Sequence, residues 1–157
     1  MHLKWNDGYY IAYFQANTNT YGTLEKLKET YSQIVSENYL IDPNVKILSI
    51  ATRPDCLNEE IAEYLSSINK IIPVWIELGF QTMHEESALL INRGYKNNKL
   101  EYAIKLLKKH NITTIVHIIN GLPNETKEMM IDTVKYLNNL DIDGIKIHML
   151  HIMKHTP

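Results

Sequence analysis

The sequence contains one cysteine, Cys56, among its 157 residues. A single cysteine cannot close a disulfide within the chain and cannot build an all-cysteine metal site, so both features are excluded. Sparse cysteine is typical of proteins of the reducing cytoplasm rather than of secreted proteins. We therefore expect a cytoplasmic protein that is stabilised by a hydrophobic core, for which the chain is long enough.

Long apolar runs and a strong excess of one charge are also missing. No uncharged stretch is long enough to span a bilayer, and residues 1–8 lack the apolar run of a signal peptide. The chain has 16 basic and 18 acidic residues, which predicts no broad basic surface for nonspecific nucleic-acid binding. With 45% hydrophobic and 22% charged residues, the composition indicates one globular domain and excludes disorder, collagen and coiled coils.

Five short apolar segments recur along the chain and are predicted to be strands. Three of them are rich in isoleucine and valine, as strands covered on both faces usually are. Segments with helical periodicity lie between them, and Thr23, Asn58 and Thr126 are typical N-cap residues. The predicted strands are 9–14, 45–51, 74–79, 114–120 and 144–149.

This alternation of strands and helices predicts an α/β fold with a parallel sheet and right-handed crossovers. Two architectures fit it, an open doubly wound sheet and an arc of a (β/α) barrel. Segment 14–18 has no glycine, so the dinucleotide-binding fingerprint is missing after the first strand. A complete eight-stranded barrel needs about 250 residues, so five units correspond to only part of one.

Polar residues gather where the predicted strands end. In both architectures ligands bind at the carboxyl ends of the strands, which lie at one edge of the sheet. These ends are the segments 15–20, 52–55, 77–82, 117–123 and 146–151. The pattern therefore predicts a shared ligand pocket at that edge.

Several of these residues also have purely structural interpretations. Gly79 and Gly121 are typical of close packing or of turns with positive φ, and His117 is typical of a hydrogen-bonded core residue. Glu77 on a buried strand must be neutral or paired, because an unpaired buried carboxylate is costly. Arg93 taken alone indicates a solvated cation at a helix end.

Other candidate motifs predict chemistry only weakly. Segment 52–55 is typical of a surface turn with a local ion pair as well as of a ligand loop. His148, His151 and His155 are three and four residues apart, but a strand that leads into a loop does not align them on one face, so we expect no metal site. Cys56 has no evident activating partner, and nucleophile-elbow and Walker motifs do not occur.

Four segments together resemble motifs of the radical S-adenosylmethionine (SAM) superfamily. They read IATRPD at 50–55, ELGFQT at 77–82, INRG at 91–94 and GLPNET at 121–126. Arg93 follows Gln81 by 12 positions, which is the spacing that the family pattern requires. The resemblance is strongest to the branch of elongator-type tRNA-modifying proteins and oxygen-independent coproporphyrinogen oxidases, and within it to an uncharacterised bacterial subgroup.

The resemblance implies a fold, a reaction and two cofactors. The family fold is a partial (β/α) TIM-type barrel, of which this chain would supply about five parallel strands. In such proteins a C-x3-C-x2-C loop binds a 4Fe-4S cluster, where SAM is cleaved reductively to methionine and a 5′-deoxyadenosyl radical. The implied partners are a substrate, RNA or a small molecule, and a reductant such as flavodoxin or ferredoxin, with no membrane involved.

The cluster-binding loop has no counterpart in residues 1–157, because C-x3-C-x2-C does not occur there. The first predicted strand corresponds to the second strand of the family. We therefore expect a partial radical SAM core, without the cluster-binding strand and loop, that is inactive alone and belongs to an active parent. The alternatives are a noncatalytic barrel-like binding or scaffold domain and an aldolase-like barrel whose Schiff-base lysine is Lys146.

Roles of single residues also follow from the resemblance. Asn17, Thr18 and Asn19 match the region that contacts the methionyl amine of SAM. Gln81 and Arg93 match residues that hold the ribose and the carboxylate, the latter through a charge-assisted hydrogen bond.

Four more residues match other parts of the family site. His117 stands where some relatives carry an aspartate for the ribose, Gly121 lies on the adenine side, and Lys146 and His148 face the substrate. The expected cofactor-binding set is Asn17, Thr18, Asn19, Thr52, Glu77, Gln81, Arg93, His117 and Gly121.

A barrel makes a further geometric prediction about this set. Gln81, Arg93 and His117 should face one cavity above the sheet, with Asn17 and Thr52 on its near wall. Because a buried guanidinium is costly without an anion, Arg93 should be free for a ligand carboxylate or held by Glu77. Loss of the Arg93 side chain should leave the fold intact.

Overall fold

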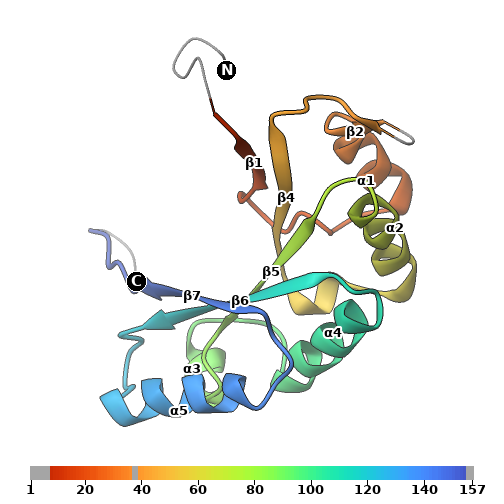
Figure 1. The fold of residues 1–157 in the computed structure, drawn as a ribbon. Helices are drawn as coiled ribbons and strands as arrows, with labels where there is room; N and C mark the ends of the chain where they lie inside the picture. The colour runs from red at the N-terminus through yellow and green to blue at the C-terminus, as the bar shows by residue number, and fades with distance from the viewer. Residues whose placement is uncertain (1–7, 37–38, 155–157) are drawn as a thin grey trace.

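The computed structural model describes residues 8–36 and 39–154. Its main sheet has five strands, which lie side by side in chain order and are all parallel. They are β1 (Tyr10–Phe14), β4 (Val45–Thr52), β5 (Val74–Gln81), β6 (Thr113–Asn120) and β7 (Gly144–Met149). The sheet curls into an open half-barrel (Figure 1). Because the strand order never reverses, the barrel prediction is confirmed and the doubly wound alternative is excluded.

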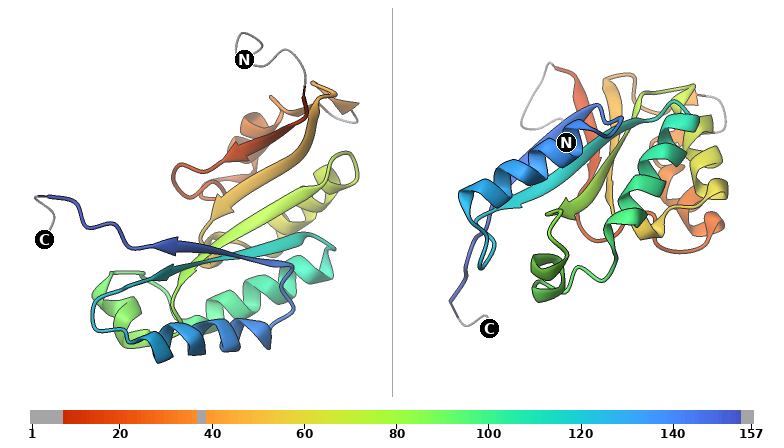
Figure 2. Two further views of the ribbon diagram at one scale, coloured as in Figure 1. Left: turned by 60° about the vertical axis from the view of Figure 1, so that its left-hand side comes forward. Right: turned by 90° about the horizontal axis from the view of Figure 1, so that it is seen from below.

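All the helices lie on the convex side of this sheet, and the concave side is open between β1 and β7 (Figure 2). The predicted N-cap side chains of Thr23, Asn58 and Thr126 each accept a hydrogen bond from a backbone N–H in the first helical turn. The helices are α1 (Leu24–Tyr31), α2 (Glu59–Asn69), α3 (Glu85–Leu90), α4 (Asn97–Lys109) and α5 (Lys127–Asn138), with one 3₁₀ turn, η1 (Pro54–Cys56). None of the helices in the described residues is long and apolar enough to cross a membrane.

A small antiparallel hairpin in the connection from α1 to β4 was not predicted from the sequence. It pairs β2 (Val35–Ser36) with β3 (Tyr39–Leu40). Strands of two residues are too short to show an alternation of apolar and polar side chains, which explains why the pattern missed them.

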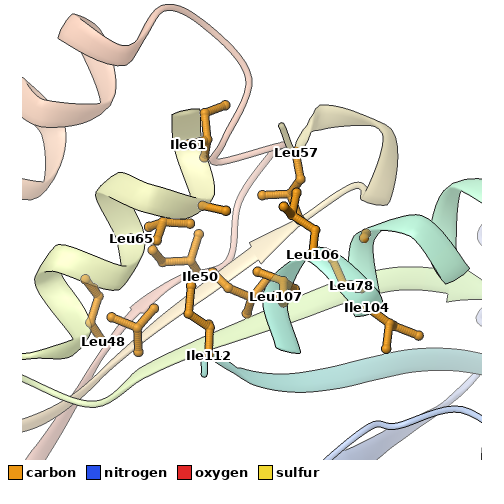
Figure 3. Packing of buried hydrophobic residues seen from close by; sticks show 14 of the residues in the cluster. Leu48, Ile50, Leu57, Ile61, Leu65, Leu78, Ile104, Leu106, Leu107 and Ile112 are labelled. Carbon is orange, nitrogen blue, oxygen red and sulfur yellow. The ribbon is translucent and has the colours of Figure 1, made fainter. Parts of the chain in front are cut away.

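The hydrophobic core lies between the convex face of the sheet and the helices. Ile50 of β4 and Leu78 of β5 are fully buried there against Leu65 of α2 and Leu107 of α4 (Figure 3). Because successive side chains of a strand point to opposite faces, the residues that alternate with this core face the concave side. Strands that supply apolar side chains to the core therefore supply polar ones, such as Ser49 and Glu77, to the barrel interior.

Candidate functional site

Two hollows open at the carboxyl edge of the sheet, where the sequence predicts a ligand pocket. The first has a volume of about 350 Å³ and lies at the ends of β5 and β6. The second, of about 560 Å³, lies beside the loop that follows β1. The first is lined by Arg53, Gly79, Gln81, Ile91, Arg93, Tyr95, Ile119, Leu122 and Leu150, and the second by Asn17, Thr18, Tyr21, Arg53, Asp55 and Cys56.

Gln81 reaches the first hollow because the end of β5 is irregular. The pairing of β5 with β6 shifts by one residue between Gly79 and Gln81, and Gln81 has a φ of 70°. A side chain at position 79 would place its Cβ 3.0 Å from Nε2 of Gln81. Gly79 therefore makes room for the Gln81 amide at the strand end.

Arg93 lies at the same edge, but the protein itself surrounds its guanidinium. Its side chain is 1% exposed. Nε donates to the carbonyl oxygen of Tyr95 at 2.9 Å, and Nη1 donates to the carbonyl oxygens of Phe80 at 3.3 Å and Thr82 at 2.8 Å. Nη2 donates to the Glu85 carboxylate at 3.2 Å and to Oδ1 of Asn97 at 3.0 Å.

These contacts overturn two expectations about Arg93 and weigh against a third. A side chain that is 1% exposed is not a solvated helix-end cation. The carboxylate that pairs with Arg93 is Glu85, which opens α3, and not Glu77. The guanidinium also ties the end of β5 to the start of α4, so the expectation that its loss leaves the fold intact has no support from its surroundings.

Arg53 lines both hollows, and its side chain is far more exposed to solvent than that of Arg93. Its Nε and Nη2 donate to the two carboxylate oxygens of Asp55 at 2.9 and 2.8 Å, which is the local ion pair that one of the two interpretations of segment 52–55 predicts. Hydrogen bonds with Asp55 raise the pKa of Arg53, and those with Arg53 lower the pKa of Asp55, so both stay charged. The Arg53 side chain is nevertheless 41% exposed.

Glu77 is the centre of a separate polar cluster on the concave face, the Glu77 cluster. Its Oε1 accepts a hydrogen bond from Ser49 at 2.5 Å. Its Oε2 accepts from Tyr13 at 2.8 Å, His117 at 2.5 Å and Lys146 at 3.0 Å. The partners come from β4, β1, β6 and β7, so this one carboxylate of β5 contacts the four other strands of the sheet.

The electrostatics of the Glu77 cluster follow from this crowding. Burial alone would raise the pKa of Glu77, but hydrogen bonds from Ser49, Lys146, Tyr13 and His117 outweigh it and lower the pKa to about 2. Burial lowers the pKa of His117, so at neutral pH the imidazole is neutral and its Nε2–H donates to the carboxylate. Burial also opposes the charge of Lys146, but hydrogen bonds with Tyr13 and Glu77 raise its pKa.

This environment does not suit the alternative in which Lys146 forms a Schiff base. A Schiff-base lysine needs a lowered pKa so that its amine is free to attack a carbonyl. Lys146 instead has a raised pKa and donates to Tyr13 at 2.9 Å and to Glu77. The aldolase-like interpretation therefore finds no support in the site.

No group of three or more histidine, cysteine, aspartate or glutamate side chains suited to a metal ion occurs in residues 8–36 and 39–154. The His148 ring lies 5.1 Å from that of His117, and its Nε2 is buried without a hydrogen-bond partner among the described residues. His155, the third histidine of the spacing noted in the sequence, lies outside the described residues.

The structure divides the expected cofactor-binding residues among several places. Gln81 and Arg93 line the first hollow, and Asn17 and Thr18 line the second. Glu77 and His117 belong instead to the Glu77 cluster, below the strand ends. His117 is therefore not among the residues that line the hollow with Gln81 and Arg93.

The remaining expected residues, Asn19, Thr52 and Gly121, line neither hollow. The Asn19 amide donates to the carbonyl oxygens of Phe14 and Ala51, each at 2.9 Å, and so closes the loop after β1 onto β4. The Thr52 hydroxyl is buried and hydrogen-bonded to that of Thr20 at 2.6 Å. Gly121 adopts a φ of 84° in the turn after β6 and lines neither hollow.

Sequence reasoning missed Tyr95 as part of the site. Its hydroxyl donates to the carbonyl oxygen of Gly79, and its ring centroid lies 4.9 Å from Cζ of Arg93 and 5.3 Å from Cζ of Arg53. The residue follows the INRG segment directly, so its place next to Gly94 was the only available signal.

Known proteins are similar to this chain in sequence and in fold. The chain is 47% identical over 157 residues to the uncharacterized protein YtqA of Bacillus subtilis, covering 100% of this chain and 47% of YtqA. It is 39% identical over 149 residues to the uncharacterized protein MJ0486 of Methanocaldococcus jannaschii, covering 94% of this chain and 44% of that protein. The chain thus spans about half the length of the curated relatives it matches.

A solved structure is similar to this chain in fold, and the model of a protein superfamily matches most of its sequence. Coproporphyrinogen III oxidase (HemN) of Escherichia coli, a radical SAM enzyme, matches with a TM-score of 0.70 at 19% identity. The match covers 87% of this chain and 30% of HemN, and at that identity it shows the fold alone. The model of the Radical SAM superfamily matches residues 2–137. Because this match spans most of the sequence, the chain belongs to the radical SAM superfamily.

Proposed function

We propose that this chain is the SAM-binding part of a protein that cleaves SAM reductively at a 4Fe-4S cluster and produces a 5′-deoxyadenosyl radical. The observation that carries the proposal is the pair of hollows at the carboxyl edge of a half-barrel, in a chain whose superfamily match covers residues 2–137. Carboxyl ends of parallel strands are where barrels of this type bind their ligands.

The first hollow has the chemistry that a nucleoside needs. Ile119 and Leu122 offer apolar surface for the faces of a base, and Gln81 offers an amide that both donates and accepts hydrogen bonds for ribose hydroxyls. The second hollow, with Asn17 and Thr18, is polar and suits the amino-acid end of SAM. In this arrangement the chain binds and orients SAM, and the residues named here do not themselves react.

The residues of this chain do not fit the cluster. The sequence has one cysteine, and the described residues contain no group of three metal-ligating side chains. In the proposal the cluster ligands belong to another part of the whole protein. No step of the chemistry is assigned to a residue of this chain.

Ligand binding tests the proposal directly in the 157-residue chain. S-adenosylhomocysteine (SAH), which is not cleaved reductively, should bind with 1:1 stoichiometry in isothermal titration calorimetry. Gln81→Asn keeps a residue that tolerates positive φ but withdraws the amide, so we expect about tenfold weaker binding, the size of one lost hydrogen bond. Gln33→Asn, the same change at an exposed position outside both hollows, should bind SAH as the unmodified chain does.

Catalysis is tested in a full-length relative that carries the C-x3-C-x2-C motif. With SAM and dithionite under anaerobic conditions it should form 5′-deoxyadenosine, which chromatography quantifies. Binding of SAH without any 5′-deoxyadenosine would instead favour the second candidate, a noncatalytic binding or scaffold domain, which the single cysteine of this chain keeps open.

For the substrate, we propose that it approaches the concave face. A hollow of about 490 Å³ lies there beside Lys146 and Tyr13, with apolar walls that include Trp75 and Ile115. The proposed substrate is RNA or a small molecule, and the proposed reductant is a flavodoxin or ferredoxin. Cross-linking of SAH-loaded protein to RNA separates the two substrate classes, because a small-molecule enzyme gives no adduct.

A further inference from the structure

The hollow of about 490 Å³ on the concave face has no lining residue in common with the two hollows at the carboxyl edge. Members of the Glu77 cluster form one side of it, and its apolar walls include Trp75 and Ile115. Trp75 precedes Glu77 by two residues on β5, and Ile115 stands two residues before His117 on β6. Because residues two apart share a face of a strand, these apolar walls lie on the amino-terminal side of the Glu77 cluster.

The oxygens of the Glu77 cluster are already occupied by hydrogen bonds. An ionised carboxylate has about four acceptor sites, and Glu77 accepts from the side chains of Ser49, Tyr13, His117 and Lys146. The Tyr13 hydroxyl donates to Glu77 and accepts from Lys146. A ligand rich in donors, such as an amine or a sugar, would therefore find few acceptors in this hollow.

Lys146, in contrast, keeps a donor for a ligand. Its ammonium carries three N–H groups, of which two donate within the described residues, to Tyr13 and to Glu77. The side chain lines the hollow and is 38% exposed, so the third N–H is available there. Burial opposes the charge of Lys146, but hydrogen bonds with Tyr13 and Glu77 raise its pKa. The ammonium therefore donates a hydrogen bond and does not attack a carbonyl.

The charges that face the hollow cancel. The Glu77 carboxylate and the Lys146 ammonium lie 3.0 Å apart, and the other lining residues are uncharged. A ligand carboxylate or phosphate would have to share Lys146 with Glu77 and lose its water between apolar walls, which is costly. A carbonyl oxygen accepts the same N–H without that cost. The hollow thus complements an uncharged ligand with one oxygen acceptor and disfavours the phosphates of RNA.

We propose that this hollow binds an uncharged, largely apolar small molecule through a carbonyl oxygen that accepts a hydrogen bond from Lys146. This inference rests on the proposed function, because it takes the ligand to be the substrate, and it selects a small molecule over RNA. The apolar body of the ligand lies against Trp75 and Ile115, on the amino-terminal side. Its carbonyl end is therefore the end nearer to the carboxyl edge, where the proposed SAM site lies.

Four probes that share one bicyclic body test the class of ligand. α-Tetralone carries a carbonyl, tetralin has no polar group, and the amine and the carboxylic acid of tetralin are charged at neutral pH. Binding to the 157-residue chain is followed by NMR through the indole N–H of Trp75, and Trp5→Phe removes the other of the two indoles of the sequence. We expect tetralone to bind about tenfold more tightly than tetralin, the size of one hydrogen bond. Both charged probes should bind more weakly than tetralone.

Lys146→Met keeps an apolar side chain of similar length but removes the donor. It should lower the affinity for tetralone about tenfold and leave that for tetralin unchanged, so the preference is abolished. Lys135→Met is the matched control, because it makes the same change at an exposed position of α5 that does not line the hollow. It should keep the preference, and the amide spectrum of each variant should show an unchanged fold.

Different failures identify different errors. If the unmodified chain binds tetralin as tightly as tetralone, or if Lys146→Met keeps the preference, the carbonyl contact is wrong. If the carboxylic acid binds more tightly than tetralone, the ligand is an anion and the proposed class is wrong. An unstructured oligoribonucleotide that shifts the Trp75 resonance and competes with tetralone would make RNA the occupant.

SAH titrated into the same samples reports separately on the proposed function. SAH binding without a preference for tetralone overturns this inference and leaves the proposed function standing. A preference for tetralone without SAH binding overturns the proposed function, and with it the role of the ligand as substrate, while the binding chemistry of the hollow stands.

Discussion

Glu77 and Arg93 are both buried charges, with 5% and 6% of their surface exposed, but their partners come from different distances along the chain. The partners of Glu77 are side chains that lie 28 to 69 residues away. Those of Arg93 lie 2 to 13 residues away, and three of them are backbone carbonyls. The Glu77 carboxylate is therefore hydrogen-bonded by residues that the tertiary fold brings together, whereas the Arg93 guanidinium is hydrogen-bonded by residues of its own segment.

The Glu77 cluster connects the two edges of the half-barrel. Lys146 of β7 donates to the hydroxyl of Tyr13 in β1 at 2.9 Å, although these strands are not neighbours in the sheet. Both side chains also bond to Glu77. The contact between Lys146 and Tyr13 can form only because the sheet curls, so the Glu77 cluster depends on the curvature of the barrel.

The Arg93 cluster, which is the guanidinium with its five hydrogen-bond partners, instead organises one loop. Segment 80–97 folds around the guanidinium, whose hydrogen bonds place α3 and the start of α4 beside the end of β5. Substitutions in the Arg93 cluster should consequently cost more stability than substitutions in the Glu77 cluster.

Arg93→Met should cause the largest loss of stability. It removes the Arg93 donor from the buried carbonyl oxygens of Phe80 and Thr82 and leaves Glu85 without its counter-ion, so we expect the free energy of unfolding to fall by about 3–5 kcal/mol. Urea denaturation measures it. Arg53→Met removes an exposed ion pair and should cost less than about 1 kcal/mol; equal losses in the two variants would remove the distinction between the arginines.

Glu77→Gln should cost less, about 2–3 kcal/mol, because the shape is kept but the amide places donors against Lys146 and His117. The exposed Glu86→Gln is the control and should change the free energy of unfolding very little. A neutral result for Glu77→Gln would mean that the four hydrogen bonds contribute nothing net and that apolar packing alone sets the curvature.

The pH dependence of stability should separate the clusters further. The pKa of Glu77 is lowered from 4.5 to about 2 in the folded chain, so its contribution is complete above its unfolded pKa and is lost as the pH falls from about 4.5 toward 2. Unfolding free energy measured across this range should therefore decline less steeply in Glu77→Gln than in the unmodified chain. Parallel curves would show that Glu77 has an ordinary pKa.

Lys146→Met should have the smallest effect, about 1 kcal/mol or less, since its side chain is 38% exposed and solvent weakens its pairing with Glu77. The loss of one donor should also raise the pKa of Glu77 in the folded chain. The pH range over which the contribution of Glu77 to stability is lost should therefore end at a higher pH. A cost as large as that of Arg93→Met would show that the link between β1 and β7 holds the half-barrel together.

Part of the site was predictable from local patterns. The TRPD segment indicated the Arg53–Asp55 ion pair, because partners two residues apart in a turn meet whatever the rest of the fold does. The polar strand ends likewise indicated hollows at the carboxyl edge, since parallel strands bring all these ends to one edge. The place of His117 beside Glu77, and not in the hollow of Gln81, was not predictable, because its partner lies 40 residues away on the neighbouring strand.

Apolar runs, their spacing and the N-caps by themselves determined the order of strands and helices, and each predicted strand agrees with the structure to within two residues. These features depend on side chains that are close in sequence. Only the tertiary structure decided that Arg93 is enclosed, that Arg53 is accessible and that Glu77 bonds to four strands. The physical reason is that burial and long-range hydrogen bonds depend on how the sheet curls, which brings together residues that no local pattern relates.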